Sequence, residues 1–110
     1  MGNKVGYLGE LEHVLLWTVI RLGDDAYGMA VRNDLEQRAG RDVARGAVYI
    51  TLDRLVQKGY LESELGDPSA ERGGRARRYF TVTEAGKAAL RQARKALVSA
   101  WDGLEGAVEH

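Results

Sequence analysis

The chain has 110 residues, enough for one compact domain but not for a second hydrophobic core. Its 16 basic and 16 acidic residues cancel, so a basic surface can arise only from local clustering. There is no cysteine, and the only histidines are His13 and His110. This composition excludes disulfide bonds, thiol catalysis, thiolate zinc sites and multi-histidine metal centres, and we expect neither a metal nor a cofactor.

Three helices are predicted in the first half of the chain. Apolar residues spaced three and four apart predict a first helix over residues 8–22 and a second over residues 27–39. A third helix is predicted from about residue 45 to residue 58. Each is followed by a glycine, as is typical of helix C-termini: Gly23, Gly40 and Gly59. The inward stripe of the third helix consists of Val48, Leu52, Leu55 and Val56, with Tyr49 and Thr51 at its borders.

A hairpin and a final helix are predicted in the second half. From residue 60 the apolar period changes to two, which predicts strands over residues 60–65 and 76–82, joined by a loop with the only proline. Thr83 is predicted to cap the final helix. Its apolar residues alternate at spacings of three and four, like the seam of a helix pair: Leu90, Ala93, Leu97, Ala100, Leu104 and Ala107. The expected fold class is mainly α with a small β-hairpin.

The order of these elements is that of a winged helix-turn-helix. In this arrangement an exposed third helix fits the major groove of DNA, and the hairpin, or wing, reaches the flanking backbone. We expect residues 1–82 to form the DNA-binding domain. We expect residues 83–110 to form a C-terminal dimerisation helix, and the two parts to make one compact unit. In the dimer, the last helices of the two chains would pair and pack against the first helices.

Two clusters of residues are candidates for contacts with DNA. With the inward stripe buried, the third helix turns Ile50 outward, where folding does not require it but a thymine methyl would match it. Around the second strand, four arginines fall within seven positions of an otherwise neutral protein, and arginines on a wing suit phosphates or a narrow minor groove. The predicted DNA-binding residues are Arg45, Gly46, Tyr49, Ile50, Arg54, Arg72, Arg75, Arg77 and Arg78. A solvated surface helix and a solvated loop are the alternative interpretation.

Two tryptophans indicate a homodimer. Trp17 lies on a second apolar face of the first helix, and Trp101 lies in the seam of the last helix. The predicted dimer interface comprises Leu16, Trp17, Ile20, Leu90, Leu97, Trp101 and Leu104. A two-fold pair would place two recognition helices on a palindromic operator. A further hypothesis places an aromatic small-molecule effector between Trp17 and Trp101.

An enzyme is not expected from this sequence. His13 lies among apolar residues without a serine or cysteine nucleophile nearby, and Gly73-Gly74 lacks the strand-to-helix context of a phosphate-binding loop. The rival to a DNA-binding regulator is a winged-helix protein-interaction module that uses Ile50 as an anchor. No signal peptide or membrane-spanning run is visible, so we expect the protein in the cytoplasm, with no membrane partner.

Over residues 8–97 the sequence resembles the PadR family of bacterial transcription regulators. Residues 46–61 (GAVYITLDRLVQKGYL) are similar to the family's recognition-helix signature, and residues 77–86 (RRYFTVTEAG) to its second wing strand and the start of its final helix. The resemblance implies a homodimeric repressor-type regulator whose Tyr49 and wing arginines contact DNA. The short C-terminal region looks like that of the compact branch with one dimerisation helix, and residues 22–28 and 71–75 are similar to members associated with transporter operons. The chain departs from the family pattern at residues 27–29, where His-Gly-Tyr is frequent, and at Ile50, where proline is common.

Overall fold

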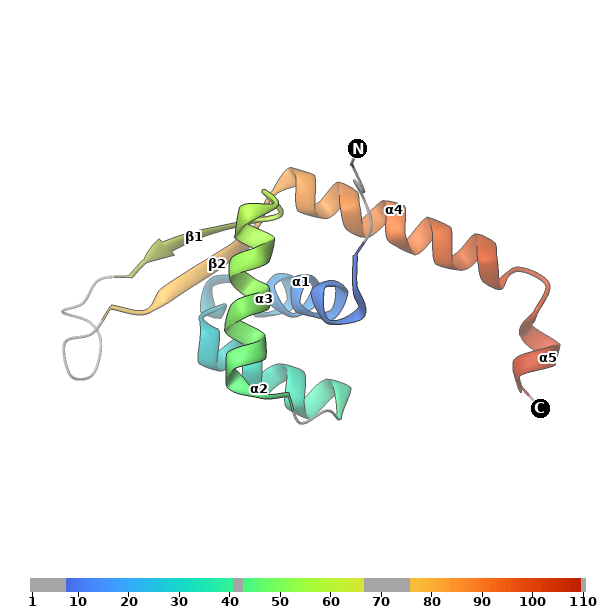
Figure 1. Ribbon diagram of the computed structural model, residues 1–110, viewed down its shortest axis with the longest axis horizontal. Helices are drawn as coiled ribbons and strands as arrows, with labels where there is room; N and C mark the ends of the chain where they lie inside the picture. Colours follow the sequence, from blue (N-terminus) through green and yellow to red (C-terminus); the bar gives the residue numbers. More distant parts are fainter. Residues whose placement is uncertain (1–7, 41–42, 67–75, 110) are drawn as a thin grey trace.

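The computed structural model describes residues 8–40, 43–66 and 76–109 and contains the predicted elements in the predicted order (Figure 1). The elements are α1 (Glu10–Leu22), the short 3-10 helix η1 (Gly23–Asp25), α2 (Gly28–Ala39), α3 (Arg45–Gln57), β1 (Leu61–Leu65), β2 (Arg78–Val82), α4 (Glu84–Trp101) and α5 (Glu105–Glu109). Strands β1 and β2 pair antiparallel, with Leu61 opposite Val82 and Leu65 opposite Arg78. The expected fold class, mainly α with a small hairpin, is confirmed.

The hydrophobic core lies where the first three helices meet the hairpin. In α3 the predicted stripe is confirmed: Val48, Leu52 and Leu55 are fully buried, and Val56 is half-buried. Thr51, expected at the border, is also buried and donates its hydroxyl to the carbonyl of Ala47 at 2.7 Å. The other buried members of the core are Leu15, Leu16, Val19, Ala26, Val31, Leu35, Leu61, Phe80, Val82 and Leu90. This packing fixes which side of α3 is left exposed.

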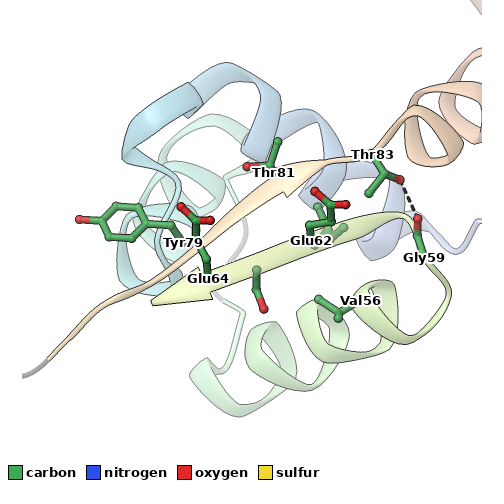
Figure 2. Close-up of a pocket in the computed structure, with 9 residues that line it drawn as sticks. Val56, Gly59, Glu62, Glu64, Tyr79, Thr81 and Thr83 are labelled. Carbon is green, nitrogen blue, oxygen red and sulfur yellow. Dashed lines mark hydrogen bonds between the residues drawn. The ribbon is translucent and has the colours of Figure 1, made fainter. Parts of the chain in front are cut away.

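Helix α4 starts against the core and then extends away from it (Figure 1). As predicted, Thr83 caps the helix: its hydroxyl oxygen accepts from the backbone N–H of Gly86 at 3.0 Å. The same hydroxyl donates to the carbonyl of Gly59 at 2.6 Å, which ties the helix start to the end of α3 (Figure 2). The side chains of residues 94–101 are exposed, so the last eight residues of α4 are left uncovered by the described part of the chain.

The final helix is shorter than its apolar seam predicted. We expected it to continue to Ala107, but α4 ends at Trp101. Asp102 leaves the helical conformation with ψ 127°, Gly103 follows with a positive φ of 84°, and a separate short helix α5 comes after them. Leu104 therefore lies beyond the break and not on a continuous seam.

A buried carboxylate joins the start of α1 to the end of α3. Glu12 accepts from the backbone N–H of Gly9 at 3.0 Å and from Lys58 Nζ at 2.8 Å. Burial by itself would raise the pKa of Glu12. The hydrogen bonds from Lys58 and Gly9, with the positive charges of Lys58 and Arg54, outweigh burial and lower the pKa below its usual value. The charged form of Glu12 is thus the one that stabilises the fold.

This lowered pKa predicts how the stability depends on pH. Because the pKa is lower in the folded than in the unfolded state, the stabilisation by Glu12 is complete above the unfolded pKa of about 4.3 and is lost as the pH falls through the folded value. Glu12→Gln should cost about 1–3 kcal/mol at pH 7, since a charged hydrogen bond is weakened. Urea unfolding from pH 7 to pH 3 should show a flatter acid loss in Glu12→Gln than in wild type. Glu62→Gln, at an exposed position, is the control and should lose stability in acid as wild type does. An equal acid loss in Glu12→Gln and wild type would contradict the prediction.

Candidate nucleic-acid interface

One face of α3 is open to the solvent. Ile50, near its centre, is 60% exposed although it is an isoleucine on a helix whose other large aliphatic side chains face the core. Arg45, Gly46 and Arg54 are exposed beside it, as predicted. Tyr49 lies at the border, 36% exposed. The structure therefore brings the five predicted residues of α3 onto one accessible surface, which we call the recognition face.

The ring of Tyr49 lies directly over Gly28, the first residue of α2. A Cβ atom built on Gly28 would be 2.2 Å from Tyr49 Cε1 and 2.6 Å from its hydroxyl, so only glycine lets the ring lie there. The surrounding groove, about 390 Å³ in volume, is lined by Tyr27, Gly28, Met29, Tyr49, Ala76, Arg77, Arg78 and Phe80. This places the Tyr49 hydroxyl beside the N-terminus of α2, an end of a helix that favours anions. The role of Gly28 was missed from the sequence.

The wing arginines have different surroundings. The guanidinium of Arg77 lies 4.1 Å from the centre of the Tyr27 ring, and that ring contacts Tyr79 edge-on at 5.7 Å. Tyr27 and Tyr79 are also joined by an isolated β-bridge, which fixes the base of the wing to the start of α2. Arg72 and Arg75, predicted to contact DNA, lie outside the described residues. Of the predicted wing contacts, Arg77 and Arg78 can therefore be located.

Arg78 faces the recognition helix. Its Nη1 lies 2.5 Å from Oδ1 of Asp53 in α3, and its Nε donates to the hydroxyl of Ser63 at 3.1 Å. The guanidinium also lies 4.9 Å from the centre of the Phe80 ring. The wing and α3 are thus linked by an ion pair at the surface. Asp53 was expected on the outward side of α3, but its pairing with Arg78 was not.

The opposite side of the hairpin is acidic. Glu62 and Glu64 of β1 lie across from Thr81 and Tyr79 of β2, and Figure 2 shows the two carboxylates on the side turned away from α3. Both glutamates are exposed. Carboxylates repel phosphates, so this side disfavours DNA, whereas the side that carries Arg78 adjoins the recognition face. The charges of the wing therefore favour one direction of approach for a polyanion.

A second exposed surface is apolar. On α1, Trp17 is 47% exposed and packs its ring 4.4 Å from that of His13, with Ile20 exposed one turn on. Further exposed apolar residues lie on α4 and α5, apart from those on α1: Leu97, Val98, Trp101, Leu104 and Val108. We call these residues, with Trp17 and Ile20, the apolar surface. The far end of α4 lies well away from α1 (Figure 1), so Trp17 and Trp101 of one chain do not face each other.

Two residues of the predicted dimer interface are buried within the chain. Leu16 has no exposed surface, and Leu90 is 8% exposed; both belong to the hydrophobic core. Their contact with a second chain stays a prediction, whereas both side chains already pack in the core of their own chain. The spacing of α1 showed two apolar faces, and the core takes Leu16 along with Leu15 and Val19.

Known proteins resemble this chain in sequence and in structure. The transcriptional regulator PadR-like family matches residues 16–92. A PadR family regulator from Clostridium difficile R20291 has a TM-score of 0.74 at 18% identity, over 89% of this chain and 97% of that one. A PadR-like regulator from Bacillus cereus has a TM-score of 0.72 at 19% identity, over 91% and 92%. A PadR family regulator from Eggerthella lenta has a TM-score of 0.67 at 26% identity, over 87% and 80%. No curated protein sequence matched.

The fold of this chain and its family are the same as those of the similar proteins. The solved relatives are of similar length and share its winged helix-turn-helix fold, which confirms the predicted architecture. Among the residues that the structure describes, no helix is long and apolar enough to cross a membrane. The family match covers most of the three core helices, the hairpin and the start of α4. The chain therefore belongs to the PadR-like family of DNA-binding transcriptional regulators, whose members are not enzymes.

Proposed function

We propose that this regulator is a repressor that binds a palindromic operator as a homodimer in the cytoplasm. The observation that carries the proposal is the recognition face of α3. Ile50 is exposed there without a partner in the described part of the chain, and Arg78, next to this face, continues it onto the wing. In a major groove, an apolar side chain can pack against the base edges while the cations beside it reach the phosphates on either side.

The residues on this face would divide the contacts between bases and backbone. Ile50 would pack against thymine methyl groups. Arg45, Arg54 and the Tyr49 hydroxyl would contact phosphates or base edges, and Gly46 would let a phosphate approach the first turn of α3. Arg77 would contact the DNA backbone beside the wing. The same role is proposed for Arg72 and Arg75 from the sequence, since both lie outside the described residues. The acidic side of the hairpin supports the same orientation, because it would face away from DNA.

The apolar surface supports the homodimer. An exposed α4 with Leu97 and Trp101, together with Trp17 and Ile20 on α1, leaves large side chains in water unless a second copy covers them. Two-fold pairing would set two α3 helices toward successive major grooves, about 10 base pairs apart. In this arrangement residues 83–110 act as the dimerisation segment.

Selection of binding sites from random DNA tests the proposal. We expect an enriched palindrome whose half-sites are separated by about one helical turn, the spacing that a two-fold pair imposes. Sedimentation should give twice the mass of one chain. Failure to enrich any sequence would contradict DNA reading and favour the protein-interaction module. An enriched single half-site with a monomeric mass would contradict the dimer.

Gly46→Ala should act in opposite directions on stability and on DNA binding. A Cβ at Gly46 meets nothing within 4 Å, so alanine should stabilise α3 by about 0.5–1 kcal/mol. If a phosphate approaches the backbone here, the added methyl group should weaken binding to the selected operator by roughly tenfold. Urea unfolding and fluorescence anisotropy measure the two effects. Gly9→Ala, whose added Cβ would lie 3.8 Å from Glu12 Oε1, an ordinary contact, is the control and should leave DNA affinity unchanged. Unchanged operator affinity in Gly46→Ala would contradict the close approach.

An aromatic effector is a second candidate feature of the function. It is favoured by an open groove of about 430 Å³ on α1, lined by Trp17, Ile20 and Arg21. Since the two tryptophans of one chain are apart, such a site would be completed by Trp101 of a second copy. Quenching of tryptophan fluorescence by flat lipophilic compounds tests this, and a Trp101→Leu variant should lose the response. A response that persists in that variant would place the compound elsewhere.

A further inference from the structure

Asp53 is a carboxylate on the surface proposed to meet DNA. It lies on the exposed side of α3, one turn after Ile50 and directly before Arg54. A negative charge in this position repels the phosphates on either side of a major groove. It therefore weakens binding to any DNA unless a cation of the protein neutralises it.

In the structure this cation is Arg78, which forms an ion pair with Asp53. The carboxylate holds Nη1 of Arg78 at 2.5 Å, while Ser63 accepts from Nε. Two donor directions of the guanidinium are thus already used within the protein. A phosphate can recruit Arg78 only by competing with a charged hydrogen bond, which is about twice as strong as a neutral one.

The ion pair between Arg78 and Asp53 contributes little to the stability of the fold. The side chains of Arg78 and Asp53 are 41% and 53% exposed, and exposed pairs contribute little to the free energy of folding. Its effect is on the charge that the protein offers to DNA. With Asp53 in place, the wing next to α3 presents one cation fewer to a phosphate.

We propose that Asp53 is a specificity-determining residue: it keeps Arg78 from binding phosphates of unrelated DNA. The proposal rests on the repressor function proposed above. Affinity for random sequences comes almost entirely from phosphate contacts, so withholding one cation lowers that affinity selectively. In the operator complex, the base contacts of Ile50 and its neighbours fix a register of α3 in which Arg78 stays on Asp53, so operator affinity does not depend on the withheld phosphate contact. The ratio between operator and random DNA is therefore larger with Asp53 than without it.

Asp53→Asn tests the proposal in the full-length protein. The variant keeps the shape of the side chain and removes the charge that holds Arg78. Affinity for random duplex DNA should rise by roughly three- to eightfold near 0.1 M salt, and the slope of log K against log salt should steepen by about one unit, as one added phosphate contact requires. Operator affinity should rise less, so the ratio between the two should fall. Thermal melting should be nearly unchanged.

Two further variants separate this mechanism from a general effect of charge. On an Arg78→Ala background, Asp53→Asn should no longer raise the affinity for random DNA. Glu64→Gln removes one exposed negative charge from the other side of the wing, and any gain it gives should be the same with or without Arg78. An unchanged affinity for random DNA in Asp53→Asn, or a gain that persists without Arg78, would overturn the proposal.

Other outcomes are equally decisive. If Asp53→Asn lowers operator affinity and leaves random DNA unchanged, Asp53 reads a base directly and the proposal is wrong. If wild type binds neither random DNA nor any selected sequence, the proposed repressor function itself fails. That result differs from a wild type that binds DNA while Asp53→Asn behaves identically.

Discussion

Ile50→Glu is expected to reduce operator affinity by at least about 100-fold and to leave the fold intact. The side chain is 60% exposed, so the substitution removes nothing from the core. In the proposed complex it replaces a contact to a thymine methyl by a carboxylate between two rows of phosphates. Losing a base contact costs about 1–3 kcal/mol for each half-site, and a dimer loses it twice. Fluorescence anisotropy with the selected operator measures the affinity, and circular dichroism with urea unfolding measures the fold.

The control for this charge is Thr81→Glu, which adds the same carboxylate at an exposed position of β2, on the acidic side of the hairpin that is turned away from α3 (Figure 2). It should change operator affinity by less than about threefold, in keeping with a distant, screened charge. Ile50→Val, in contrast, should keep the affinity for DNA in general and change the preferred sequence. If Ile50→Glu binds the operator as well as Thr81→Glu does, the recognition face is not the DNA-binding surface.

Much of the fold follows from local signals in the sequence. Helices α1, α2 and α3 end within about two residues of their predicted ends, because glycines follow them and a left-handed residue stops a helix wherever it occurs. The hairpin was predicted because its apolar period is two. The same kind of signal also explains the wrong prediction at the end of the chain. The seam continued through residue 107, but Gly103 adopts a positive φ, and apolar spacing does not report backbone conformation.

The candidate site was predicted only in part. The exposure of Ile50 follows from the 3.6-residue period once the buried stripe of α3 is known. The partners of the wing arginines do not follow from any local pattern, because Asp53 and Arg78 are 25 residues apart in the sequence. For the same reason the fit of Tyr49 over Gly28 was missed. A glycine signals that something approaches closely, but it does not say what.

Gly86→Ala is expected to destabilise the protein by about 1–2 kcal/mol. An alanine Cβ at this position would lie 2.4 Å from the carbonyl oxygen of Tyr60 and 2.8 Å from Val82 Cγ1. The Tyr60 carbonyl accepts the backbone N–H of Thr83 at 3.0 Å, so it cannot move aside without breaking the start of α4. Overpacking of this kind costs about 1–3 kcal/mol and sometimes more, which exceeds the 0.5–1 kcal/mol that alanine usually gains over glycine in a helix.

Urea unfolding of Gly86→Ala beside Gly46→Ala decides the point, because the same chemical change is made in the first turn of two helices. The two variants should shift the unfolding midpoint in opposite directions, since Gly46 has open space around it and Gly86 does not. Equal midpoints would mean that α4 can shift on the hairpin without loss. In the homodimer proposed here, such a shift would also move Trp101 and Leu97, so the same variant should weaken dimerisation in sedimentation experiments. A Gly86→Ala protein that is as stable and as dimeric as wild type would show that the close contact with Tyr60 does not fix the direction of α4.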